Sequence, residues 1–255
     1  MSSVKAMNQK FQGILMLAML LGYGMTSVAN AEFVGSIVTV DVSNSHGSAS
    51  ESWPIPDLPP QASSKAHWAL QERAILRGGQ GNEIIATIED LVVNLDGDPV
   101  VSLDFAVNAG NFDTTFTITS ATVGFAPISN PLAFASAGVT LTDGDPLPGD
   151  GAALNLIPPN TGLYQATYNS GTVFANLLPS PLSLPGAGTT DDSDDSGVQI
   201  IAGSVTDIQT SFSFKLSADD SASGTSQFEV VIPEPSTSIL IVFGFLGLLA
   251  CHRRR

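Results

Sequence analysis

The region between residues 32 and 235 contains no cysteine, and the single cysteine of the chain is Cys251 in the C-terminal tail. An internal disulfide is therefore excluded there, so the stability of this region must come from packing. Cations are also scarce, since it holds four of them against 24 acids, a net charge of −20; the cations are Lys65, Arg73, Arg77 and Lys215. Such an excess of negative charge excludes nucleic acid as a partner.

Motifs for catalysis are absent as well. The sequence has no His-Glu-x-x-His pair, no Gly-x-Ser-x-Gly elbow and no glycine-rich phosphate loop. His46 and His67 have no partner motif, so we expect surface or structural histidines. Because catalytic carboxylates of a glycosidase need no fixed sequence spacing, a polysaccharide-modifying enzyme stays open as an alternative. We expect no catalytic residue and no cofactor.

Aspartates gather in three turn-like segments beside glycine. They are Asp96 and Asp98; Asp143, Asp145 and Asp150; and Asp191, Asp192, Asp194 and Asp195. Carboxylate oxygens suit calcium, but none of these segments has the spacing of an EF-hand loop. Asp and Gly also favour ordinary solvated turns. We therefore expect no metal site, and calcium remains the alternative.

The N-terminus has the parts of a secretory signal peptide. Lys5 and Lys10 precede an apolar stretch over residues 14–21, and the small residues Ala29 and Ala31 flank Asn30. This order predicts cleavage before residue 32. The alternative, a transmembrane anchor, is disfavoured because the apolar stretch is too short to cross a bilayer.

The C-terminal 24 residues join a proline-fixed segment, a short apolar run and a basic end. Pro233 and Pro235 fix their own φ and keep Glu234 extended, so this tripeptide is accessible to an enzyme. The 13 apolar residues 239–251 follow. As a helix they cover about 20 Å of the roughly 30 Å hydrocarbon core. The cations that end the chain hold that end in the cytoplasm, so a short membrane helix is predicted rather than a core helix; they are Arg253, Arg254 and Arg255.

This arrangement resembles the PEP-CTERM sorting signal of Gram-negative bacteria. Pro233, Glu234 and Pro235 match its recognition motif, residues 239–251 its membrane helix, and residues 253–255 its basic end. The resemblance implies recognition by exosortase, a membrane-embedded enzyme similar to cysteine transpeptidases, and removal of the tail. It further implies an inner-membrane-anchored precursor, delivery to the cell surface or beyond it, and an exopolysaccharide setting.

Strand patterns fill residues 32–231, which we expect to be one secreted domain between the signal peptide (1–31) and the sorting signal (232–255). Apolar and polar residues alternate, or β-branched residues dominate, in short segments separated by Gly, Pro and Asp. These segments are residues 33–42, 101–107, 115–123, 163–168, 173–178, 212–216 and 228–232. The pattern predicts an all-β fold, an antiparallel β-sandwich.

One short helix is expected between Lys65 and Arg77, capped by Ser63 or Ser64 and ended by Gly78-Gly79. Three long loops, rich in Pro, Gly or Asp, are expected at residues 43–62, 143–160 and 179–197.

These features favour an exported, non-enzymatic protein with a structural or adhesive role. Its expected partners are exosortase and, through residues 239–251, the membrane. Exopolysaccharide is a candidate partner, since a carbohydrate-binding module is the second alternative. Such a module needs exposed aromatic rings in one platform, and the candidate rings are Trp53, Trp68, Tyr164 and Tyr168.

Overall fold

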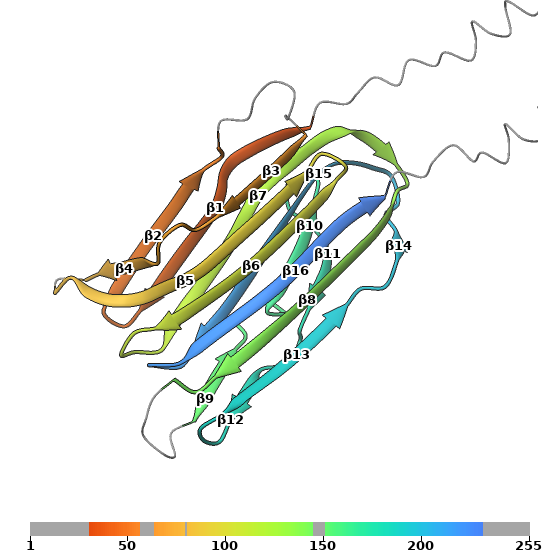
Figure 1. Ribbon diagram of the computed structural model, residues 1–255. Helices are drawn as coiled ribbons and strands as arrows, with labels where there is room; N and C mark the ends of the chain where they lie inside the picture. Colours follow the sequence, from red (N-terminus) through yellow and green to blue (C-terminus); the bar gives the residue numbers. More distant parts are fainter. Residues whose placement is uncertain (1–30, 57–63, 80, 145–150, 232–255) are drawn as a thin grey trace, which may run out of the picture.

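The computed structural model describes residues 31–56, 64–79, 81–144 and 151–231, and these form two β-sheets packed on each other (Figure 1). The described ranges contain sixteen strands and no helix. Every pair of neighbouring strands is antiparallel. The predicted all-β fold, an antiparallel sandwich, is therefore confirmed.

The first sheet consists of eight strands. They are β1 (Glu32–Asn44), β2 (Gly47–Pro54), β7 (Thr114–Ser129), β9 (Ala152–Asn155), β10 (Tyr164–Tyr168), β11 (Thr172–Leu177), β12 (Leu182–Leu184) and β15 (Ser204–Leu216). Their order is β11-β10-β15-β7-β1-β2, with β9 paired to β15 and β12 paired to β9. Strand β7 therefore lies in the middle, between the two long strands β1 and β15.

The second sheet also has eight strands. They are β3 (Lys65–Ala69), β4 (Ala74–Gly78), β5 (Glu83–Asp96), β6 (Val100–Ala109), β8 (Leu132–Thr142), β13 (Thr189–Asp195), β14 (Gln199–Ile200) and β16 (Ser221–Val231). Their order is β13-β8-β16-β6-β5-β3, while β14 pairs with β8 and β4 pairs with β5. One edge is the acidic strand β13, and charge on an edge strand discourages pairing with another chain.

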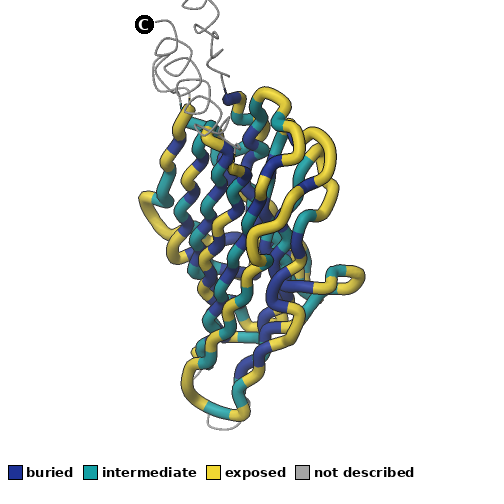
Figure 2. Tube along the Cα trace, turned by 90° about the vertical axis from the view of Figure 1, so that its right-hand side faces the viewer, coloured by how far each residue is buried: buried dark blue, intermediate teal, exposed yellow. Residues whose placement is uncertain are grey.

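Alternating side chains place the core between the two sheets. In β6, Leu103 and Phe105 are buried, whereas Ser102 and Asp104 point outward. Successive residues of a strand point to opposite faces, so one face is apolar and the other faces water. Figure 2 shows this alternation of buried and less buried residues along the strands. One continuous apolar cluster fills the space between the sheets.

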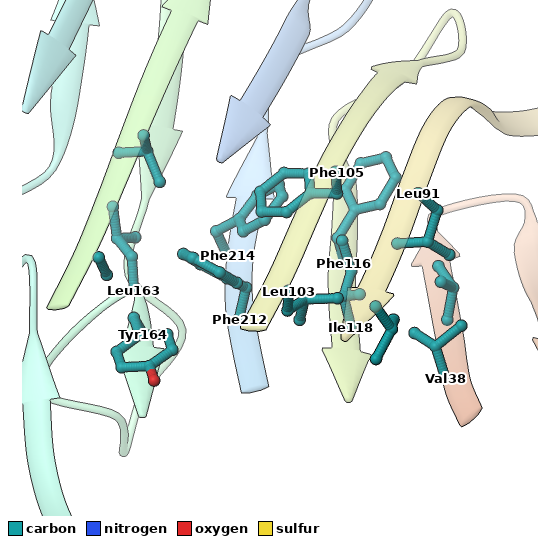
Figure 3. Packing of buried hydrophobic residues seen from close by; sticks show 14 of the residues in the cluster. Val38, Leu91, Leu103, Phe105, Phe116, Ile118, Leu163, Tyr164, Phe212 and Phe214 are labelled. Carbon is teal, nitrogen blue, oxygen red and sulfur yellow. The ribbon is translucent and has the colours of Figure 1, made fainter. Parts of the chain in front are cut away.

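Phe105 joins the two sheets at the centre of this cluster (Figure 3). It comes from the second sheet, and its ring lies 4.9 Å from that of Phe212 and 5.6 Å from that of Phe214, both on β15 of the first sheet. Gly224 on β16 makes room for the ring, because a Cβ there would lie 2.5 Å from Phe105 Cε1. The tight packing of a protein core therefore requires glycine at this position.

The seven predicted strand segments lie largely within β1, β6, β7, β10, β11, β15 and β16 and are confirmed. Strands β5 and β8 were not predicted. Strand β8 has alanine at three of its inward positions, namely Ala133, Ala135 and Ala137, so its apolar signal is weak. It is held by long ladders to β13 and β16, which no local pattern reveals.

The predicted helix at Lys65–Arg77 is wrong. This segment forms strands β3 and β4, which pair with successive parts of β5 at the edge of the second sheet. Ala66 and Leu76 point into the core from these strands. Burial of these side chains against the sheet overrides the local helical preference. The expected loops are also wrong in part, since they contain β2, β9, β12 and all of β13.

The register places the start of β1 and the end of β16 at one end of the sandwich. Glu32 pairs with Gly124 near the end of β7, and Val231 pairs with Leu132 at the start of β8. A short turn joins β7 to β8, so the four residues lie toward the same end of the sandwich (Figure 1). We call this the tail end. The opposite end, with the turns at residues 45–46, 110–113 and 217–220, is the far end.

Candidate functional site

Three turns from distant parts of the sequence meet at the far end. They follow β1, β6 and β15 and supply His46, Phe112 and Ala218. Backbone hydrogen bonds join two of the turns, since Asp219 N donates to Gly110 O over 2.9 Å and Ala109 N donates to Asp220 O over 2.9 Å. The far end is therefore a fixed surface made of several turns.

The rings of His46 and Phe112 stack on each other with a centroid distance of 3.9 Å and an angle of 20°. Phe112 is 36% exposed. His46 Nδ1 also lies 3.1 Å from Glu83 Oε2, which holds the ring from the side of β5. The backbone of Gly79, at φ +73°, packs against the carbonyl group of His46. A Cβ at this position would lie 2.2 Å from His46 O, so glycine is needed there.

A hollow of about 600 Å³ opens beside these rings. Its lining residues are Ser43, Asn44, Ser45, Asn111, Phe112, Asp113, Thr115, Lys215 and Ala218. Lys215 Nζ donates to Asp113 Oδ2 over 2.8 Å. This hydrogen bond holds the pKa of Asp113 below its ordinary value, although partial burial acts in the opposite direction.

The chemistry of the hollow suits a polar, uncharged ligand. The partly exposed Phe112 ring offers apolar contact, while the Asn44 and Asn111 side chains add amide donors and acceptors. The carboxylate of Asp113 already binds the ammonium of Lys215, so the two charges balance. Hydroxyl groups of a sugar are the kind of partner that such groups hydrogen-bond.

The four aromatic rings considered from the sequence do not form one exposed platform. Tyr164 is fully buried and packs on Phe212 with centroids 5.1 Å apart. Burial raises the pKa of Tyr164 far above its ordinary value, and the Ser226 hydroxyl offsets only part of this. Trp53 and Trp68 pack on each other at 5.4 Å and are half-buried against the core. The platform expected for a carbohydrate-binding module is thus absent at these positions.

The two histidines have different surroundings. His67 Nδ1 lies 2.6 Å from Asn94 Oδ1 on the outer face of the second sheet, as a surface histidine would. His46 belongs to a group of residues at the far end that also includes Phe112, Asp113 and Lys215, and we call this group the far-end cluster. Sequence reasoning missed Phe112, Asp113 and Lys215 as its neighbours, because turns far apart in the chain meet only through the sheet topology.

The aspartates are spread over separate places. Asp96 binds Lys65 at 2.6 Å and accepts from Asp98 N at 3.1 Å within one turn. Residues 191–195 belong to the edge strand β13. Over the described ranges, no group of three or more His, Cys, Asp or Glu side chains could hold a metal ion. Asp145 and Asp150 lie outside those ranges.

Asp104 carries a perturbed carboxyl on the outer face of the second sheet. Partial burial, followed by the charge of Asp90, raises the pKa of Asp104 above its ordinary value, and a hydrogen bond with Thr225 acts against this. Its cross-strand partners are Val92 and Thr225. Partial burial and the neighbouring charge of Asp90 account for the raised pKa of Asp104, so no catalytic role is needed to explain it.

The predicted processing residues lie almost wholly outside the described part of the chain. This applies to Ala29, to the motif Pro233, Glu234 and Pro235, and to Arg253, Arg254 and Arg255. Ala31 is described, and it is buried directly before β1. Among the described residues, no helix is long and apolar enough to cross a membrane.

No protein-family model matches the sequence, and no curated protein matches it. Solved structures with some similarity include the enzymatically active domain of tailspike protein 4 from Bacteriophage CBA120, with 9% identity, 66% of this chain and 20% of that chain covered, and a TM-score of 0.27. An arabinose-bound α-L-arabinofuranosidase has 14% identity, coverage of 75% and 31%, and a TM-score of 0.24.

A third structure is the adhesin domain of Epf from Streptococcus pyogenes. It shares 9% identity over 82% of this chain and 59% of that chain, with a TM-score of 0.24. The chain thus spans less than two thirds of each of these proteins. These TM-scores are equally low for the two enzymes and for the adhesin, so none of these similarities bears on the function of this chain.

Proposed function

We propose that this chain is an exported β-sandwich protein that exosortase sorts to the cell surface or extracellular matrix, where it acts structurally or adhesively and catalyses no reaction. The observation that carries the proposal is the order of the C-terminal segments. Pro233-Glu234-Pro235 is followed by residues 236–238, the 13 apolar residues 239–251, His252 and three terminal arginines. A polar segment before an apolar run is the order of a discarded C-terminal anchor, and a basic end keeps that end in the cytoplasm.

The first and last strands of the sandwich begin and end next to the two segments that we expect to be removed, which supports the proposal. Strand β1 starts at Glu32, the first residue after the predicted signal cleavage, and β16 ends at Val231, two residues before Pro233. Removal of both segments would therefore take away no strand of either sheet. Both strand ends, at Glu32 and Val231, lie at the tail end of the sandwich.

The polar outer faces support a role outside the cell. On the first sheet, neighbouring outward positions carry hydroxyl groups, as in the cross-strand row of Ser52, Thr39, Thr119 and Ser211. Together with the net charge of −20 over residues 32–235, such faces favour solubility in an extracellular matrix. A sandwich with polar outer faces is sufficient for a structural role outside the cell.

Intact-mass analysis of protein from the native cell surface tests the proposal. We expect a mass that lacks residues 1–31 at one end and residues 239–255 at the other. Deletion of the exosortase serves as the control, and it should leave a longer species in the inner membrane. A surface protein that still carries Arg253, Arg254 and Arg255 would contradict sorting by exosortase.

Carbohydrate binding at the far end is the second candidate function. It is favoured by one observation, the exposed Phe112 ring stacked on His46 beside a polar hollow. Because one partly exposed ring supplies the apolar contact, weak binding to single sugar units of a polymer is expected.

Retention on the producer's own exopolysaccharide tests this second candidate. Phe112→Ala in the surface-purified protein should reduce retention severalfold, because loss of the ring removes the apolar contact. Phe134→Ala, which removes a ring near the tail end, is the matched control and should leave retention unchanged. Equal retention of both variants would exclude this site. Shortening of the polymer during incubation, abolished by one Asp or Glu substitution, would instead make the protein an enzyme.

A further inference from the structure

Apolar side chains gather at the tail end on the outer face of the second sheet. They form an apolar patch that consists of Leu132, Phe134, Val198, Ile200 and Val231. Leu132 pairs with Ile200 on one side and with Val231 on the other, so three neighbouring strands contribute one row. Val198 and Ile200 are each 68% exposed, and Val231 is 45% exposed.

The rest of this face differs sharply from the patch. Toward the far end, the outward residues of β8 are Ser136, Gly138 and Thr140, and those of β16 are Thr225 and Gln227. Single exposed apolar residues are common on proteins. A contiguous apolar group at one end of an otherwise polar face indicates a surface that contacts something.

The sequence that leaves the patch limits what it can contact. Val231 belongs to the patch, and only seven residues, 232–238, separate it from the apolar run that starts at Ile239. Seven extended residues reach at most about 25 Å. The run itself is about 10 Å shorter than the hydrocarbon core, which draws its flanking residues toward the membrane surface. A lipid surface is therefore always within reach of the patch in the precursor.

We propose that the apolar patch rests on the lipid surface beside the inserted tail while the precursor awaits processing. This inference rests on the proposed function, because it needs the tail in the membrane. The patch supplies apolar contact at the interface, and the tether supplies a high effective concentration. The contact holds the domain by its tail end and keeps Pro233, Glu234 and Pro235 close to the lipid headgroups.

Charges near the patch determine which lipids it accepts. Glu229 is the cross-strand partner of Phe134, and Asp195 is the partner of Ser136 at the edge of the patch. These acids would be repelled by anionic headgroups at close range. Contact is therefore expected on zwitterionic lipid and is weakened by anionic lipid.

A site-specific probe on the full chain in phosphatidylcholine vesicles tests this inference. In a Cys251→Ala background, a polarity-sensitive fluorophore is attached at Ala202→Cys, two residues beyond Ile200, or at Ser223→Cys, near the far end of the same face. Lipids with a nitroxide headgroup should quench the probe at residue 202 severalfold more than the probe at residue 223. Val198→Ser with Ile200→Ser should abolish this difference, and both side chains are exposed, so folding is preserved.

The outcomes separate the patch from the tail. Flotation with the vesicles reports insertion of the tail, and a chain that does not float overturns the proposed membrane tail and the patch contact together. A chain that floats but shows equal quenching at both positions overturns the patch contact alone. A blue-shifted probe at residue 202 without quenching, which grows with protein density, would assign the patch to a second copy of the chain instead. Added phosphatidylglycerol should lower the quenching at residue 202.

Discussion

Replacement of Pro233, Glu234 and Pro235 by alanine is expected to remove nearly all of the protein from the cell surface. The exchange removes the backbone restriction that the two prolines impose, and alanine favours a helix in this segment. It also removes the carboxylate that exosortase would recognise. Immunoblots of surface and inner-membrane fractions should show precursor in the inner membrane in place of processed surface protein.

The chain offers a matched control for this exchange. Pro179-Ser180-Pro181 has the same proline spacing and is exposed between β11 and β12. Its replacement by three alanines should leave surface delivery unchanged. Normal surface delivery of the Pro233-Glu234-Pro235 variant would show that the tripeptide is an ordinary linker and would remove the main support for sorting by exosortase.

Phe105→Ala is expected to lower the free energy of unfolding by about 3–5 kcal/mol, as a large cavity in a packed core does. The ring contacts Phe212 and Phe214 of the opposite sheet, and it fills the space left by the missing side chain of Gly224. Its removal therefore leaves a void between the sheets. Denaturant unfolding of the processed surface protein, followed by tryptophan fluorescence, measures the change.

Phe112→Ala is the control, because it also removes a phenylalanine ring, but one that is exposed at the far end. It should change the free energy of unfolding by less than about 1 kcal/mol, as surface substitutions usually do. A loss for Phe105→Ala no larger than that of the control would mean that the two sheets do not depend on this contact.

The sequence predicted the sandwich because inward and outward residues alternate clearly in strands such as β6 and β7. It failed where tertiary pairing decides the structure. Residues 65–77 have helical preference, but β5 provides an edge that takes up β3 and β4. It also failed for β8, whose small inward residues give little apolar contrast.

The far-end cluster could not be predicted for a different reason. His46 and Phe112 come from two turns and Lys215 from the end of β15, and no spacing in the sequence links them. Only the strand order, which puts β1 and β15 on either side of β7, brings these turns together. The tail motif, in contrast, is contiguous and needs no fold to be recognised.

The length of the strands sets how far the proposed precursor would extend from the membrane. Strand β1 runs from the tail end to the far end over 13 residues, and at about 3.3 Å per residue it spans roughly 43 Å. A protein held by its tail end therefore presents the turn at Ser45-His46 at that height, beyond the headgroup layer. A peptide epitope inserted into this turn would be displayed outward, away from the membrane, so the sandwich is suited to serve as a spacer for surface display.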